Sequence, residues 1–240
     1  MNEGTILLLV VVALLASAMS AVAGFGGVVV LLPVLTLVFG VRDAVPILTV
    51  AQLVGNASRV WLNRRAVCWP VVGWFAVGSV PLGALGGVVF ATAPLPLLTR
   101  AVGAFLLLAV ACRHLGLKTN RPMPRWAFAP VGAAGSFVSA VAGTAGPLTA
   151  PFFLAFGLVK GAYIGTEAAT AVVTHATKIA VYGTAALMTA RGVGVGLLLG
   201  AVMVVGTHLG KRLVDRVTER AFVLIVEAVL VVAGLYFLIV

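Results

Sequence analysis

Long stretches without a charged side chain dominate this sequence. Residues 4–41, 66–99, 126–159 and 192–210 contain no Asp, Glu, Lys or Arg. A helix needs about 20 apolar residues to cross a hydrocarbon core of about 30 Å, and each stretch is about that long or longer. The sequence therefore predicts an all-α, polytopic membrane helical bundle. A β-barrel would show short alternating segments instead.

Composition excludes the soluble classes. The 240 residues are 62% hydrophobic and 9% charged, whereas soluble domains are about 45–50% apolar and about 25% charged. A soluble enzyme, a disordered chain and a secreted disulfide scaffold are therefore excluded. The net charge of +10 would indicate nucleic-acid binding only in a soluble protein. We expect the lipid bilayer as environment, and no nucleic-acid partner, cofactor or metal.

The first apolar run is interpreted as mature membrane structure. The start, Met1-Asn2-Glu3, lacks the basic segment of a signal peptide. Along the chain, apolar runs predict helices over residues 5–23, 27–39, 44–62, 70–90, 97–112, 126–142, 147–158, 163–188, 193–210 and 220–240.

The two halves of the chain repeat each other. The sequence SAVAG at Ser20–Gly24 recurs at Ser139–Gly143, 119 residues later, and Pro33 and Pro151 recur at nearly the same spacing. Internal duplication is common in transporters. We predict a first transmembrane repeat over residues 1–112, a basic cytoplasmic connector over 113–125 and a second transmembrane repeat over 126–240. The pairs Gly83/Gly87 and Gly206/Gly210 also recur, and small residues at this spacing are typical of helix packing.

The distribution of basic residues favours inverted repeats. Each half crosses five times if the short segments 27–39 and 147–158 span the membrane, or three times if they are re-entrant hairpins. Either odd number places twelve of the sixteen basic residues on one side, namely Arg59, Arg64, Arg65, Arg113, Lys118, Arg121, Arg125, Lys160, Lys211, Arg212, Arg216 and Arg220. The positive-inside rule makes that side cytoplasmic. Both termini are then outside a bacterial-type cytoplasmic membrane.

Glycine-rich breaks interrupt the apolar runs at equivalent places in the two halves. They are Gly24-Phe25-Gly26-Gly27 and Gly143-Thr144-Ala145-Gly146-Pro147. Irregular backbone at membrane depth survives only inside protein or beside water. The N-terminus of the short helix after each break offers free N–H groups and a positive dipole end to an anion. Phe25 would line one side of such a site, and the Thr144 hydroxyl would donate a hydrogen bond to the anion. The alternative is a tight interhelical turn.

Polar residues form a stripe within one predicted helix of each half. One stripe is Thr49, Gln52, Asn56 and Arg59, and the other is Glu167, Thr170, Thr174, His175 and Lys178. At the repeat spacing, Asn56 matches His175 and Arg59 matches Lys178. Ionisable residues within the membrane usually face a cavity. Two cations and two hydrogen-bonding residues from the two halves would suit a small oxyanion.

Each of these residues also has a simpler interpretation. Arg59 lies near a helix end and would then snorkel to the membrane surface. Glu167 would pair with Lys178 or cap a helix, and His175 would be a core residue whose hydrogen bonds are satisfied. Both residues also have a functional alternative, which is to carry a proton; the ordinary pKa of histidine is about 6.5. Gln52, Asn56 and the threonines would hydrogen-bond neighbouring helices.

The GFGG break followed by Pro33, the second break with Pro147 and Pro151, and the tandem halves resemble the sulfite exporter TauE/SafE family over nearly the whole chain. Ala145-Gly146-Pro147 departs from the family pattern, in which a further Gly-Gly is common. The resemblance implies a multi-pass permease of the cytoplasmic membrane that moves sulfite, organosulfonates or related small sulfur-containing anions, without an ATPase.

We therefore expect a secondary transporter for a small sulfur-containing anion, working by alternating access of the inverted repeats. The candidate binding residues are Gly24, Phe25, Gly26, Gly27, Gln52, Asn56, Arg59, Thr144, Ala145, Gly146, Thr174, His175 and Lys178, with His175 and Glu167 as candidates for proton coupling. The alternatives are an anion channel and a non-transporting membrane partner subunit. An enzyme is not expected, and a homodimer is one oligomeric state left open.

Overall fold

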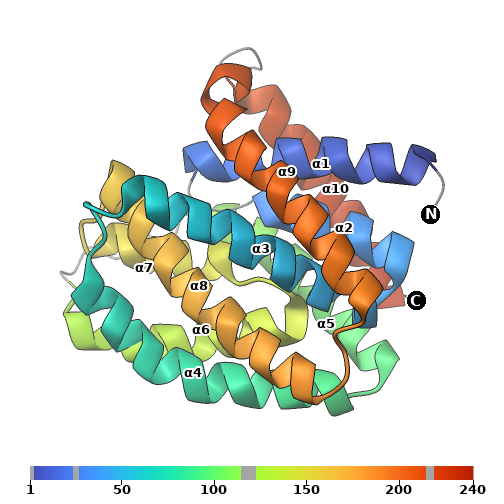
Figure 1. The fold of residues 1–240 in the computed structure, drawn as a ribbon, viewed down its shortest axis with the longest axis horizontal. Helices are drawn as coiled ribbons and strands as arrows, with labels where there is room; N and C mark the ends of the chain where they lie inside the picture. The colour runs from blue at the N-terminus through green and yellow to red at the C-terminus, as the bar shows by residue number, and fades with distance from the viewer. Residues whose placement is uncertain (1–2, 24–26, 115–122, 215–218, 240) are drawn as a thin grey trace.

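The computed structural model describes residues 3–23, 27–114, 123–214 and 219–239, and within these ranges the chain forms helices and no strands. The elements are α1 (Glu3–Ala23), α2 (Gly27–Phe39), α3 (Val41–Asn63), α4 (Trp69–Thr92), α5 (Leu95–His114), the 3-10 turn η1 (Arg125–Ala127), α6 (Phe128–Ala142), α7 (Gly146–Ala155), α8 (Lys160–Thr184), α9 (Ala190–Val214) and α10 (Glu219–Ile239) (Figure 1). The predicted all-α class is confirmed. The short segments are helices of 13 and 10 residues, about 20 and 15 Å long.

Two predicted helices end earlier than the sequence suggested. α7 stops at Ala155, because Gly157 adopts a φ of 93° and the Leu158 N–H donates back to Phe153 O. α8 stops at Thr184, where Ala186 has a φ of 56° and the Leu187 N–H donates to Tyr182 O. Both are turns that close a helix with a left-handed residue. The second uses alanine instead of glycine, so the sequence carried no stop signal there.

Helices of the two halves pack in an exchanged pattern. α4 packs on α6 and α8, whereas α9 packs on α1 and α3; in addition α3 packs on α8 and α5 on α10 (Figure 1). If α1–α5 correspond in order to α6–α10, the contacts of α4 with α6 and α8 correspond to the contacts of α9 with α1 and α3. The α3–α8 and α5–α10 contacts each join a helix to its own counterpart. A two-fold relation between the halves predicts this pattern, which supports the duplication. The exact repeat boundaries stay a prediction.

Close approach of α4 and α6 depends on glycine. A side chain at Gly78 would collide with Ala129 O, and one at Gly132 would collide with Phe75 O. In the exchanged counterpart, Gly206 of α9 lies against α1 near Leu14 O. Such backbone contact is the packing mode of helices in lipid.

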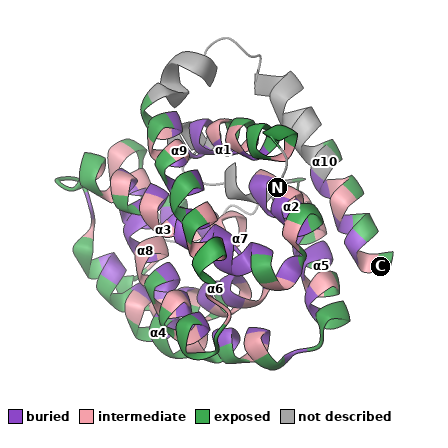
Figure 2. Ribbon diagram, turned by 45° about the vertical axis from the view of Figure 1, so that its right-hand side comes forward, coloured by how far each residue is buried: buried purple, intermediate pink, exposed green. Residues whose placement is uncertain are grey.

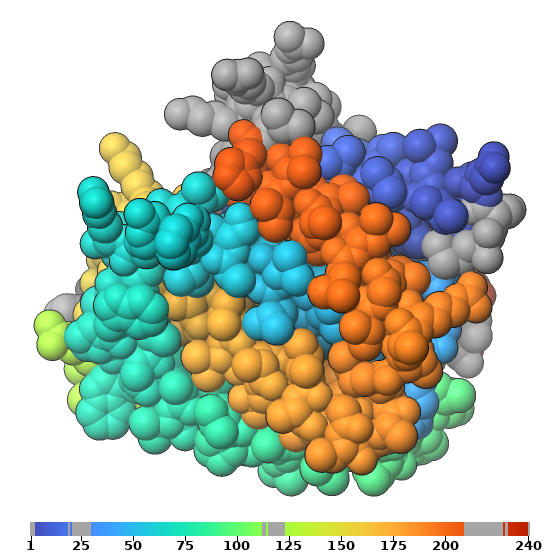
Figure 3. All heavy atoms as spheres, in the orientation of Figure 1, coloured from blue at the N-terminus to red at the C-terminus, as the bar shows by residue number. Residues whose placement is uncertain are grey.

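α4 and α9 are also the most membrane-like helices. Among the described residues, Trp69–Thr92 and Ala190–His208 are long and apolar enough to cross a bilayer by length and composition. Figure 2 shows exposed residues along the outer face of α4 and buried residues on inward faces of the bundle. Figure 3 shows α3, α4, α8 and α9 together forming one face of the molecule. Large apolar side chains stay exposed on these helices, including Val77, Leu85, Leu197 and Val205, as expected where lipid is the solvent.

Candidate functional site

The polar faces of α3 and α8 meet the start of α7 around a small cavity. Its volume is about 50 Å³, which holds roughly three or four water molecules or an anion of similar size. The lining residues are Gln52, Asn56 and Arg59 of α3; Thr144, Ala145, Gly146 and Thr149 at the second break; Glu167, Thr170, Ala171, Thr174 and His175 of α8; and Ser20, Phe75, Gly135 and Ser139. Most of the candidate residues in α3 and α8 therefore lie together.

Arg59 is the cation of this cavity. The residue is 6% exposed, and its Nη2 donates to Asn56 Oδ1 and, at 3.2 Å, to Glu167 Oε2. Its Nη1 donates to Ser20 O at 3.4 Å. The snorkelling interpretation is therefore wrong, because the guanidinium points into the protein and donates to buried groups there.

The suggested pairing of Glu167 with Lys178 is also wrong. Glu167 pairs with Arg59 across the α3–α8 contact. Glu167 and Lys178 are eleven residues apart on α8, which separates them by about 16 Å along the helix axis. The polar stripe on α8 places Glu167 and Lys178 on one helix face, but the Glu167 side chain cannot reach Lys178 along it.

Lys178 is fully buried but is not among the residues that line the cavity. Its Nζ donates to Ser139 O at 2.8 Å and to Gly143 O at 3.1 Å, with Ser139 Oγ at 3.4 Å. The last carbonyls of a helix have no intrahelical partner, and a lysine ammonium satisfies them well. In this structure Lys178 holds the end of α6 and the start of the second break. Its direct contact with an anion stays a prediction.

The two matched cations make a matched contact. Arg59 reaches Ser20 O and Lys178 reaches Ser139 O, and these serines begin the two copies of SAVAG. Both serines also line the cavity, although they were not among the candidate residues. The repeat itself was the signal that identifies them.

The second break places a helix N-terminus in the cavity wall. Gly143, with a φ of 91°, ends α6, and Ala145 and Gly146 line the cavity where α7 begins. Pro147 occupies the first turn of α7, where its missing N–H costs nothing. The first N–H groups and positive dipole end of a ten-residue helix therefore adjoin the cavity.

The first break lies mostly outside the described residues. Gly24, Phe25 and Gly26 belong to the gap between α1 and α2, and Gly27 begins α2. Their predicted roles stay predictions.

His175 lines this cavity and has a buried hydrogen-bonding atom that the described residues leave unused. The residue is 3% exposed, and its buried Nδ1 has no hydrogen-bond partner within the part of the chain that the structure describes. A buried polar atom without a partner costs about 1–3 kcal/mol. A ligand that bonds to Nδ1 would recover that energy.

Three hydroxyls join the helices behind the cavity. Ser136 Oγ lies 2.6 Å from Ser79 Oγ and 2.8 Å from Thr174 Oγ1, and Ser79 and Thr174 are 3.1 Å apart. The three residues belong to α4, α6 and α8. This cluster fixes where Thr174 meets the cavity.

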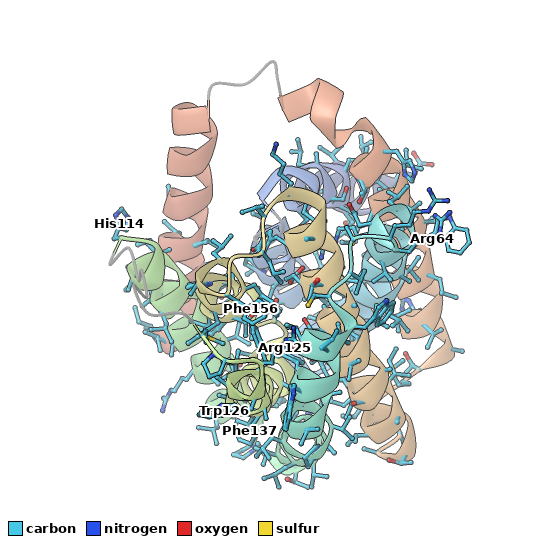
Figure 4. The ribbon with its side chains drawn as sticks, turned by 90° about the vertical axis from the view of Figure 1, so that its left-hand side faces the viewer. Arg64, His114, Arg125, Trp126, Phe137 and Phe156 are labelled. Atoms are coloured by element: carbon cyan, nitrogen blue, oxygen red, sulfur yellow. The ribbon has the colours of Figure 1, made fainter. Side chains whose placement is uncertain are left out.

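The two ends of the bundle differ. At the N-terminal end of α3 lies a wider cavity of about 480 Å³, whose lining includes Asp43, Ile47, Thr189 and Arg191. At the opposite end an aromatic cluster is closely packed: the ring of Phe153 lies 5.1 Å from Phe128, 6.2 Å from Phe75 and 6.5 Å from Tyr163, and Phe128 lies 5.5 Å from Phe156. Figure 4 looks onto this end of the bundle and labels Arg64, Arg125, Trp126 and Phe156 there.

A helical bundle with exposed apolar flanks and a small, charged, buried cavity beside a helix break has the architecture of a membrane transporter. The sequence match agrees: the chain belongs to the sulfite exporter TauE/SafE family, whose model matches residues 9–237. This is a family of membrane transporters and not of enzymes. No curated protein and no solved structure matches the chain.

Proposed function

We propose that the chain is a secondary transporter that moves a small sulfur-containing anion, such as sulfite or an organosulfonate, across the cytoplasmic membrane. The observation that carries this proposal is a cavity lined by Arg59, His175 and the start of α7, in which the buried Nδ1 of His175 has no hydrogen-bond partner among the described residues. These groups supply a hydrogen bond, a positive charge and a helix dipole, which together suit an oxyanion. The volume of about 50 Å³ favours the smallest substrates.

The residues have distinct roles in this proposal. Arg59 provides the positive charge, and Asn56 holds the guanidinium in place. His175, Gln52, Thr174 and the N–H groups at Ala145 and Gly146 provide hydrogen bonds.

Orientation follows from charges and aromatic residues. Trp61 and Trp126 are exposed near the end that carries Arg64 and Arg125, and the Arg64 guanidinium lies 4.4 Å from the Trp61 ring centre. Tryptophan with basic residues marks a membrane interface on the cytoplasmic side. We therefore place the aromatic cluster toward the cytoplasm and both termini outside, in a multi-pass topology.

Alternating access would open these two ends in turn. The wider cavity reaches Ile47, five residues before Gln52 and so about 7 Å along the α3 axis, whereas the aromatic cluster closes the other end. Because α4 packs on α6 and α8 and α9 packs on α1 and α3, each moving body would contain helices from both repeats.

Uptake by the purified full-length protein in proteoliposomes tests this function. Sulfite, thiosulfate, sulfate, sulfoacetate and taurine are compared, with protein-free vesicles as the blank. We expect saturable uptake of at least one sulfur anion, accelerated by the same anion inside the vesicles, and loss of uptake in Arg59→Ala. Arg64→Ala is the matched control, because Arg64 lies exposed on the same side of the bundle.

Three results would overturn the proposal. Single-channel currents without counterflow would indicate an anion channel. An active partner complex with no uptake by the protein alone would indicate a partner subunit. Undiminished uptake in the Arg59→Ala, Lys178→Ala double variant would show that the anion binds at another place in the protein.

A further inference from the structure

The cavity contains an acid beside its only arginine among the described lining residues. Glu167 Oε2 accepts from Arg59 Nη2 at 3.2 Å, and both side chains are at least nine-tenths buried. The negative charge of Glu167 offsets the positive charge of Arg59. An anion that approaches Arg59 therefore meets a like charge at the same guanidinium, and two anionic groups at such close range disfavour each other.

Packing does not require this carboxylate. At the repeat spacing of 119 residues, the counterpart of Glu167 is Leu48, which is fully buried in the apolar core of α3. The corresponding position of one repeat therefore contains a leucine, and only the other repeat carries the acid. Buried ionisable residues in membrane helices are costly and mark functional sites.

Few other ionisable groups surround Glu167. Arg59 faces it from α3, and Tyr163 and His175 lie one turn before and about two turns after it on α8. The sequences of α4, α6 and α7, which pack around α8, contain no ionisable side chain. Arg59 stays charged at every physiological pH, and tyrosine ordinarily titrates near pH 10. Among the described residues that line the cavity, Glu167 and His175 are thus the two groups able to exchange a proton.

We infer that Glu167 is an internal competitor of the transported anion, so that the anion and a proton bind together. This inference rests on the proposed function. A proton from solution adds to the Glu167 carboxylate, the ion pair with Arg59 breaks, and the anion takes the place of the carboxylate on the guanidinium. The added proton offsets one negative charge, so a monovalent anion enters with no change in the charge of the cavity, and a divalent anion such as thiosulfate enters with a net change of −1.

Uptake driven by a pH gradient tests the coupling in the full-length protein. Thiosulfate is the probe, because it keeps its charge across the working range and any pH dependence then belongs to the protein. In wild type, an inward proton gradient should raise the initial uptake rate several-fold. In Glu167→Gln that stimulation should vanish while thiosulfate counterflow persists. Glu3→Gln removes an exposed carboxylate at the start of α1 and should keep the wild-type stimulation.

Proton uptake on binding provides a second readout, independent of transport. Thiosulfate is added to protein in weakly buffered detergent with a pH indicator. Binding and protonation are reciprocally linked, so wild type should take up about one proton per bound anion, and Glu167→Gln should take up none. His175→Gln separates the two candidates, because it should retain the proton uptake.

The outcomes distinguish the inference from the function on which it rests. If wild type transports thiosulfate and Glu167→Gln keeps the full gradient stimulation, the inference is overturned while the transport function stands. Proton uptake that disappears in His175→Gln and persists in Glu167→Gln overturns it as well. If wild type moves none of the sulfur anions, the transport function itself fails.

Discussion

Arg59 and Lys178 occupy matched positions on α3 and α8, yet the structure uses them differently. Both reach the carbonyl of the matched serine near the end of the first helix of their own half, α1 for Arg59 and α6 for Lys178. Arg59 additionally contacts Asn56 and Glu167 in the cavity. The hydrogen bonds described for Lys178 all go to residues at the end of α6. Arginine has five donors in a fork and lysine three on one atom. One half therefore places its cation in the cavity wall, and the other uses its cation to hold the end of α6.

The largest effect is expected from Arg59→Ala. The substitution removes the positive charge from the cavity and leaves Glu167 as an uncompensated buried carboxylate. Breaking a buried ion pair costs about 3–5 kcal/mol of stability, and we expect anion uptake to fall by at least about 100-fold, or 2.7 kcal/mol. Thermal unfolding in detergent and initial uptake rates measure the two effects.

The double variant Arg59→Ala, Glu167→Leu separates stability from function. A leucine occupies the matched position in the first repeat, so the apolar replacement should recover most of the lost stability. Uptake should stay lost. If uptake returned with stability, Arg59 would be a structural residue and would not supply the charge that binds the anion.

Lys178→Met should mainly affect stability. Methionine fills a similar volume but leaves Ser139 O and Gly143 O without their donor. Unsatisfied buried polar groups cost about 1–3 kcal/mol, so we expect the free energy of unfolding to fall by about 2–3 kcal/mol.

Anion affinity separates the two cations in the same Lys178→Met protein. At a temperature where the variant is folded, the KM for uptake should stay within about tenfold of wild type, equivalent to 1.4 kcal/mol. A variant of normal stability whose anion affinity collapses would place the lysine in the binding site.

His175→Leu should show the opposite pattern, at a smaller magnitude. Because the Nδ1 atom of His175 has no partner among the described residues, its loss should not lower stability. A ligand hydrogen bond is worth about 0.5–1.5 kcal/mol, so the KM for anion uptake should rise up to about tenfold. His208→Leu is the control, since His208 is exposed on α9. Reduced stability with an unchanged KM would instead make His175 a core residue.

The sequence was sufficient to predict that the helices and the polar faces exist, because uncharged stretches and helical spacing are local properties, but it did not predict where α7 and α8 end. It placed Gln52, Asn56, Thr174 and His175 on faces that the structure brings to one cavity. It failed on the partner of Glu167, because an ion pair between α3 and α8 depends on which helices meet. The exchange that brings α4 onto α6 and α9 onto α1 is likewise a property of tertiary packing that no local pattern encodes.

The smallest effect is expected from Ser20→Ala and Ser139→Ala. Both cations reach these residues through the main-chain oxygen, at 3.4 and 2.8 Å, and the side-chain contact of Ser139 Oγ with Lys178 is longer, at 3.4 Å. Alanine preserves the carbonyl, so each substitution should change the free energy of unfolding by less than about 1 kcal/mol. Thermal unfolding of the two variants side by side measures this. A loss for Ser139→Ala as large as that for Lys178→Met would mean that Lys178 is held by the hydroxyl, and the matched backbone contact would no longer explain why both repeats keep a cation at this position.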